Sequence, residues 1–135
     1  YEALRIKHKQ TGDNAYQFDE PLAIVREDLV GFRRNRSKLP GHAETTTGVL
    51  HANTGPSGHG FPIAVGIALA LDLAQCPARV WFLEGEGGFT PGGTHETENA
   101  VWGAQLGKKF IALEDFNDAC IDRVVSEVVP CPPTI

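Results

Sequence analysis

Hydrophobic and polar positions follow one another along this chain in a pattern that predicts helices separated by short buried strands. Residues 1–18 are polar and lack a period, so an irregular lead-in is expected. A first helix is predicted from Asp19 to around residues 37–41, with one apolar face at helical spacing: Leu22, Val25, Leu29 and Phe32. Residues 40–60, rich in Gly, Thr, His and Pro, indicate a long loop of the kind that is usually functional or disordered.

The pattern in the second half of the chain predicts a helix, a strand, a helix and a strand, in that order. Gly and Ala leave little bulk along residues 60–74, which predicts a helix that packs closely on a sheet. Residues 78–84 and 108–115 predict buried strands, and residues 94–107 between them predict a helix that turns Ala100, Val101, Ala104 and Leu106 inward. This order predicts a parallel βαβ unit and therefore an α/β fold. The Pro-rich end of the chain is expected to be extended.

The loops after both strands, residues 85–93 and 116–121, are expected to leave the sheet at its carboxyl edge, where ligands of open α/β sheets bind. They carry Glu86 and Asn117, whose oxygens suit Mg²⁺ or Ca²⁺. Glycines beside Glu86 and a following helix N-terminus would favour a diphosphate. A plain Gly-rich turn with a solvated Glu86 and a capping Asn117 explains the local pattern as well, and the pattern alone favours it.

Common phosphate and nucleophile motifs do not fit. The chain has no GxxxxGK[ST], and its Gly-rich loops miss the dinucleotide spacing. "GPSGHG" resembles the GxSxG elbow, but His59 stands where Gly is required, so Ser57 is a poor candidate nucleophile. A zinc site of His51, His59 and His95 is conceivable without the support of an HxxxH helix. His42 and His59 in the long loop are candidate binding residues or ordinary surface histidines.

Composition narrows the class of protein. The 135 residues suffice for one compact domain, and 41% are hydrophobic, as expected for a soluble globular fold. A net charge of −5 argues against a nucleic-acid partner, and "RRNRSK" at residues 33–38 is interpreted as a solvated helix end. The longest apolar run, residues 61–71, is about half of the ~20 residues that span a bilayer, so no membrane contact is expected.

The cysteines and the first residues of the chain indicate the cellular compartment. Cys76, Cys120 and Cys131 are odd in number and form no CxxC pair, which favours reduced thiols in the cytoplasm or an organellar matrix. The opening residues lack the apolar core of a signal peptide. The first residue is Tyr rather than Met, which is expected of a fragment or a processed product.

Four separated motifs occur in one order: "FRRNRSKLPGHAE", "NTGPSGHGFPIAVGIALA", "VWFLEGEGGFTPGGTHE" and "FIALEDFNDACID". In this order and spacing the chain resembles the thiamine-diphosphate domain of transketolases. The resemblance implies an open, mostly parallel sheet with helices on both faces, present here as a partial domain. It covers residues 28–122, with residues 1–27 as a lead-in and residues 123–135 as a tail.

The resemblance also implies a role for each matched residue. His42 would face the thiazolium and the donor substrate, and the backbone of Gly55, Pro56 and Ser57 would line the aminopyrimidine. Glu86, Asn117 and the carbonyl of Ala119 would hold Mg²⁺ or Ca²⁺, and the Gly87 amide would contact the diphosphate. The implied function is transfer of two-carbon ketol units between sugar phosphates.

This chain departs from the family pattern in ways that suggest an alternative. Glu86 replaces a metal-binding aspartate, and Pro91 stands where the family has an acidic residue. The upstream histidine motifs are absent, as is the module that supplies the glutamate activating the aminopyrimidine. The chain alone is therefore expected to be inactive, and it would need a second copy or a partner chain that carries the pyrimidine-binding module. The alternative is a degenerate, non-catalytic domain that acts as a structural or interaction subunit.

Overall fold

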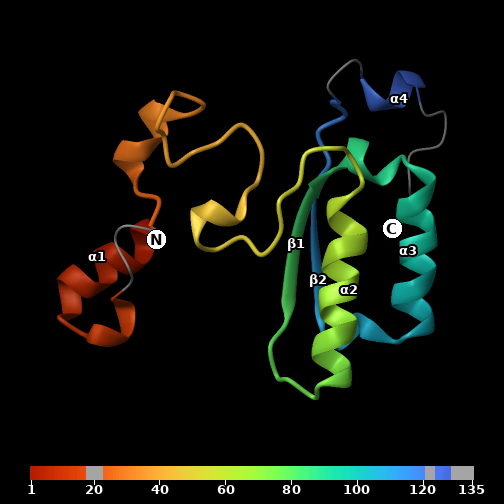
Figure 1. Ribbon diagram of the computed structural model, residues 1–135, viewed down its shortest axis with the longest axis horizontal. Coiled ribbons are helices and arrows are strands. Elements are labelled where there is room, and N and C mark those ends of the chain that lie inside the picture. The colour runs from red at the N-terminus through yellow and green to blue at the C-terminus, as the bar shows by residue number, and fades with distance from the viewer. Residues whose placement is uncertain (18–22, 121–123, 129–135) are drawn as a thin grey trace. The chain divides into compact units, whose positions relative to one another are not determined.

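The computed structural model describes residues 1–17, 23–120 and 124–128, and it divides the chain into two compact units, Tyr1–Gly55 and Pro56–Ile135. Each unit is described by itself (Figure 1). Four features predicted from the sequence lie outside the described residues: the helix start at Asp19 and Pro21, the apolar position Leu22, the thiol of Cys131 and the extended tail.

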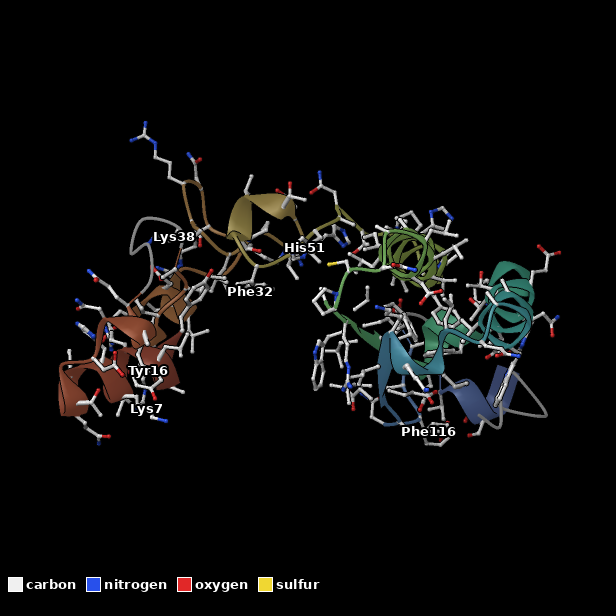
Figure 2. The ribbon with its side chains drawn as sticks, turned by 90° about the horizontal axis from the view of Figure 1, so that it is seen from below. Lys7, Tyr16, Phe32, Lys38, His51 and Phe116 are labelled. Atoms are coloured by element: carbon white, nitrogen blue, oxygen red, sulfur yellow. The ribbon has the colours of Figure 1, made fainter. Side chains whose placement is uncertain are left out.

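The first unit opens with a helix where the sequence predicts an irregular lead-in. α1 spans Glu2–Thr11 and ends at Gly12, whose left-handed φ of 68° lets its N–H close the last turn on the His8 carbonyl. No residue of α1 is buried, so polar side-chain contacts support it, including an ion pair between Arg5 and Glu27 at 3.4 Å. Arg5 pairs with Glu2 at 2.8 Å, and the ammonium of Lys7 lies 4.6 Å from the centre of the Tyr16 ring (Figure 2).

The predicted first helix is wrong in extent. Of residues 23–37, only Arg26–Gly31 are helical. They form a 3₁₀ helix whose first turn is closed by the Asp28 carboxylate, which accepts from the N–H of Val25. Turns follow up to Ser37, and the predicted apolar positions Leu29 and Phe32 are exposed. Further 3₁₀ turns in this unit span Asn14–Tyr16 and Thr45–Thr47.

The second unit contains the predicted α/β arrangement (Figure 1). α2 spans Gly60–Leu73 and is followed by β1 (Val80–Gly85), α3 (Gly92–Gly103), β2 (Phe110–Asp115) and α4 (Val125–Val128), with 3₁₀ turns at Glu86–Phe89 and Leu106–Lys108. These bounds agree with the predicted second helix and both predicted strands to within two residues. Within the described ranges, no helix has the length and apolar character needed to cross a membrane.

The two strands form a parallel pair, as predicted from the strand–helix–strand order. Val80 is paired with Phe110 at one end of the ladder, and Gly85 with Asp115 at the other. α2 and α3 both begin at the end of the sheet where β1 and β2 end (Figure 1). The parallel α/β fold is therefore confirmed, and its carboxyl edge gathers two strand ends and two helix N-termini.

The core of this unit lies between α2 and one face of the sheet. Phe61 on α2 stacks on Phe82 of β1 with ring centroids 5.2 Å apart, and Phe89 and Phe110 complete the aromatic cluster. Buried Ala64, Val65 and Ala68 let α2 approach the sheet closely, as its small residues predict. The inward face predicted for residues 94–107 is half right. Val101 and Leu106 pack in the core, whereas Ala100 and Ala104 are exposed. Thr94 and Thr97 are the buried residues of α3.

The opposite face of the sheet is open in the described part of the chain. Trp81 and Leu83 on β1 are 68% and 72% exposed, and Leu113 on β2 is also exposed. Parallel sheets are normally covered on both faces. An exposed apolar face is therefore typical of a sheet whose second face is covered by further protein.

Candidate functional site

The two loops predicted to form a site meet at the carboxyl edge of the sheet. Gly85 and Asp115, the last residues of β1 and β2, are paired in the ladder, so the loops leave side by side. A Cβ atom built at Gly87 would lie only 3.0 Å from the Cβ of Cys120. Glycine at position 87 therefore permits the first loop to pack directly on the second.

Glu86 lies at this edge of the sheet, and its carboxylate is buried. Its side chain is 1% exposed, and neither of its carboxylate oxygens has a hydrogen-bond partner within the described residues. An unpaired buried carboxylate is costly, and a bound cation is one way to offset that cost. Burial raises the pKa of Glu114, and the nearby carboxylates of Glu86 and Glu98 raise it further.

Asn117 is held in a defined position in the second loop. Its side-chain amide donates to the Asp115 carboxylate at 3.0 Å, and its side-chain oxygen accepts from the Ala119 N–H at 2.9 Å. Asp118, with a left-handed φ of 57°, accepts from both the backbone N–H and the hydroxyl of Ser126. The carboxamide oxygen of Asn117 keeps a second lone pair, so it could still bind a cation.

The residue types at this edge are those from which a hard divalent cation takes its oxygen ligands. The donors expected from the sequence are one carboxylate, one carboxamide and one main-chain carbonyl, which suits Mg²⁺ when a diphosphate supplies further oxygens. The orphaned oxygens of Glu86 are the structural observation that supports this fit. Within residues 1–17, 23–120 and 124–128, no three or more His, Cys, Asp or Glu side chains are grouped to hold a metal, so the zinc alternative receives no support.

Within the second unit, the strip 56–61 reaches the same edge through Gly58, which has a left-handed φ of 78°. A Cβ built at Gly58 would lie 2.8 Å from Pro91 and 3.0 Å from the Gly88 carbonyl oxygen. Thr94 is fully buried and donates its hydroxyl to that same carbonyl at 3.0 Å. Glycine at position 58 thus lets the strip dock on the Gly-rich loop.

Thr94 is a positioning residue that the sequence reasoning missed. One sequence feature could have identified it: Thr94 is a hydroxyl residue in the first turn of a helix that follows a Gly-rich loop. In contrast, Pro56, Ser57 and His59 are exposed, so their side chains do not fill the turn at Gly58. Ser57 and His59 are therefore compatible with a backbone strip that remains accessible.

His42 and Gly55 meet within the first unit. A Cβ at Gly55 would lie 3.7 Å from both Cγ and Nδ1 of His42, so the imidazole ring rests on this glycine. The loop is closed by two hydrogen bonds, from the Thr54 N–H to the Ala43 carbonyl at 2.9 Å and from the Thr45 N–H to the Asn53 side chain at 2.7 Å. These bonds bring together two predicted site residues that are 13 positions apart.

Comparison with known proteins agrees with these features. The family described as "Transketolase, thiamine diphosphate binding domain" matches residues 18–130. The transketolase of Bacillus subtilis is 40% identical over 108 residues, which cover 71% of this chain and 16% of that protein. The solved structure of the transketolase from Campylobacter jejuni superposes with a TM-score of 0.66 at 33% identity, over 75% of this chain and 17% of that one.

Two further relatives are named as subunits of larger enzymes. One is a subunit of the apulose-4-phosphate transketolase of Actinobacillus succinogenes, 39% identical over 69% of this chain and 35% of its own length. The other is a subunit of the 6-deoxy-6-sulfo-D-fructose transketolase of a Clostridium species, 32% identical over 79% of this chain and 39% of its own length. This chain thus spans well under half of the relatives that it matches. It belongs to the transketolase family and carries part of that family's thiamine diphosphate binding domain.

Proposed function

We propose that this chain is the part of a transketolase-like enzyme that binds thiamine diphosphate and Mg²⁺, with residues 28–122 forming that part. The observation that carries the proposal is the buried carboxylate of Glu86, which has no hydrogen-bond partner among the described residues. It lies on the loop that packs against Cys120, so a cation there would be offered donors from both loops. Such a cation would offset a charge that the described residues leave unbalanced.

Each matched residue has a proposed task. Glu86, Asn117 and the Ala119 carbonyl hold the metal, and the Gly87 amide binds the diphosphate. The backbone of Gly55, Pro56 and Ser57 lines the aminopyrimidine, and His42 faces the donor substrate. Thiamine diphosphate, when bound, would supply the electron sink that two-carbon ketol transfer needs. The residues of this chain bind and orient it.

The complete enzyme requires a pyrimidine-binding module from a second copy or a partner chain. Two relatives that are named as subunits support this division of labour. The open apolar face of the sheet, with Trp81 and Leu83 exposed, also supports further protein around this domain. The substrates are sugars with a terminal oxyanion, since those relatives are named for a sugar phosphate and a sulfo-sugar.

A second candidate function is that of a degenerate, non-catalytic domain that acts as a structural or interaction subunit. The deep burial of Glu86 favours it, because a carboxylate that is 1% exposed must open the loop before it can reach a cation. The two candidates differ in one property, the binding of the cofactor.

Calorimetric titration of the intact chain, together with any co-purifying partner, tests the choice. Thiamine diphosphate with Mg²⁺ should bind saturably, and Glu86→Ala and Asn117→Ala should weaken binding at least tenfold, which corresponds to about 1.4 kcal/mol. Glu96→Ala, which removes an exposed carboxylate from α3, is the matched control and should bind as the parent does. Absence of binding at millimolar cofactor in a folded chain would refute cofactor binding and leave the structural role.

A further inference from the structure

Two glutamates at the carboxyl end of the sheet have buried oxygens without a hydrogen-bond partner among the described residues. Both side-chain oxygens of Glu86 are of this kind, and so is Oε1 of Glu114. Glu86 begins the loop after β1, and Glu114 is the last residue but one of β2. Each of these oxygens has lost its contact with water without gaining a partner, which is costly for a charged group.

The register of the ladder places the two side chains on one face of the sheet. Glu84 is paired with Glu114, and successive residues of a strand alternate between its faces. The backbone of Gly85 is extended, so Glu86 follows Glu84 on the face that carries Phe82. That face is the one on which the core packs, which agrees with the burial of Glu86.

The charge of Glu86 acts on Glu114. Burial raises the pKa of Glu114, and the carboxylates of Glu86 and Glu98 raise it further. The carboxylate of Glu98 has a partner of its own, because Nδ1 of His95 lies 3.3 Å from its Oε2. In this group of described carboxylates, Glu86 and Glu114 are therefore the two that have buried, unpaired oxygens.

Glu84 is directed elsewhere, although it is paired with Glu114 in the ladder. Its carboxyl group occupies the space that a Cβ at Gly88 would fill, so it rests on the backbone of the Gly-rich loop. In the described part of the chain, its oxygens are not among the buried atoms that lack a partner. Glu84 thus has the same chemistry as Glu114 at the same level of the sheet, without the same need for a cation.

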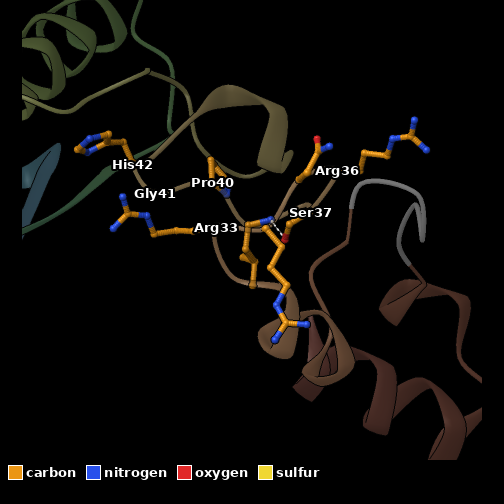
Figure 3. Close-up of a pocket in the computed structure, with 9 residues that line it drawn as sticks. Arg33, Arg36, Ser37, Pro40, Gly41 and His42 are labelled. Atoms are coloured by element: carbon orange, nitrogen blue, oxygen red, sulfur yellow. Dashed lines mark hydrogen bonds between the residues drawn. The ribbon is translucent and has the colours of Figure 1, made fainter.

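The positive charge of the first unit is balanced in another way. Arg33 and Arg36 extend from a turn beside an open pocket, and both are exposed to water (Figure 3). The Arg33 side chain lies along Gly41, where a Cβ would be 3.0 Å from its Nε. The helix end predicted for residues 33–38 is wrong, because these residues form a looped turn. Water reaches these guanidinium groups, whereas the unpaired oxygens of Glu86 are closed off from it.

We propose that Glu86 and Glu114 together hold a hard divalent cation, and that they do so before any diphosphate is bound. Two carboxylates match the charge of such a cation and offset the cost of their own burial. Water and main-chain oxygens complete its coordination, since three or more His, Cys, Asp or Glu side chains are not grouped around a metal position within the described ranges. The inference rests on the proposed function and adds Glu114, which the resemblance does not assign, to the residues that hold the metal.

Titration of the intact chain with calcium chloride alone tests this pair without the cofactor. Ca²⁺ is the probe because Mg²⁺ gives up its water reluctantly and usually relies on phosphate oxygens. Ionic strength is kept constant with potassium chloride. Calorimetry should show saturable binding, and the Tm should rise with the concentration of Ca²⁺, because a cation that binds the folded chain stabilises it.

Variants separate the pair from a general attraction of cations. Glu114→Gln should weaken Ca²⁺ binding about tenfold or more, because one of two charged ligands is lost. Glu114→Asp keeps the charge with a shorter reach, so its affinity should fall between those of the parent and Glu114→Gln. Glu84→Gln is the matched control and should weaken binding about threefold at most, since separated charges near water interact weakly. Thermal melts without Ca²⁺ establish that each variant is folded.

Two results would overturn the proposal. Absence of saturable Ca²⁺ binding in the folded parent would mean that the two carboxylates are relieved by a proton instead. Equal losses in Glu114→Gln and Glu84→Gln would mean that negative charge in general, and not this pair, attracts the cation.

These results are separate from calorimetry with thiamine diphosphate. A chain that binds Ca²⁺ through the pair and does not bind the cofactor retains this site and refutes the proposed function. A chain that binds the cofactor with Mg²⁺, and whose cation affinity is unchanged in Glu114→Gln, keeps the proposed function and refutes the role of Glu114.

Discussion

Glu84 on β1 lies directly opposite Glu114 on β2 in the parallel ladder. Burial raises the pKa of Glu84, and burial together with the carboxylates of Glu86 and Glu98 raises that of Glu114. The carboxyl end of this sheet therefore carries negative charge that the described residues leave unbalanced, and this charge has measurable consequences.

The metal-free chain should lose stability as the pH rises. A carboxyl whose pKa is raised by folding stabilises the fold below its unfolded pKa of about 4.3, and this contribution is lost as the pH rises through the folded value. The pKa of Glu27 is lowered in the folded chain, so its contribution to the unfolding free energy increases as the pH rises. The effect of Glu114 is therefore isolated by comparing the pH dependence of a variant with that of the parent chain. Glu114→Gln should flatten the fall in unfolding free energy between about pH 4 and pH 7, measured with urea.

The matched control for this pH series is Glu96→Gln, which neutralises an exposed carboxylate on α3. It should keep the slope of the parent chain. If Glu114→Gln also keeps that slope, the carboxylates at the strand ends do not interact as the structure indicates.

Glu86→Gln should stabilise the chain in the absence of a cation. It removes an unpaired buried charge at nearly constant volume, which should raise the unfolding free energy by about 1 kcal/mol. The same change should abolish the rise in Tm that Mg²⁺ with inorganic diphosphate gives the parent. Thermal melts with and without these additions measure both effects. An equal rise in Tm in parent and variant would show that Glu86 holds no metal.

Gly58→Ala should be strongly destabilising. The left-handed φ of 78° and the clash of a Cβ with Pro91 and Gly88 together should cost about 2 kcal/mol or more. Gly66→Ala is the matched control, since a Cβ at this exposed position in α2 meets nothing within 4 Å. It should stabilise by up to about 1 kcal/mol in urea denaturation. Similar effects at the two positions would contradict the docking of the strip at Gly58.

Neighbouring residues on β1 should respond in opposite ways to truncation. Phe82 is 7% exposed and stacks on Phe61, so Phe82→Ala should cost about 3–5 kcal/mol. Leu83 is 72% exposed on the other face, so Leu83→Ala should change stability by about 0.5 kcal/mol or less. Chemical denaturation of both variants measures the difference. A large loss at Leu83 would mean that this face of the sheet is covered in solution.

Sequence patterns predicted the second unit well and the first unit poorly. α2 and the two strands carry apolar residues that share one core, so their periods are visible in the sequence. α1 buries no residue and is supported by the Glu2–Arg5 pair and the Gly12 cap, which leave no apolar stripe to detect. The predicted first helix failed because its apparent apolar face at Leu29 and Phe32 has no core to cover.

The sequence by itself determined the order of the βαβ unit, and therefore that Glu86 and Asn117 follow strands that end at one edge. Parallel pairing makes this result independent of side-chain detail. Only the tertiary structure decided that Gly58 docks at Gly88 and that Arg33 lies along Gly41. The burial of Glu86 without a partner was decided there too. These features depend on the distance of closest approach between separate backbone segments, which periodicity does not encode.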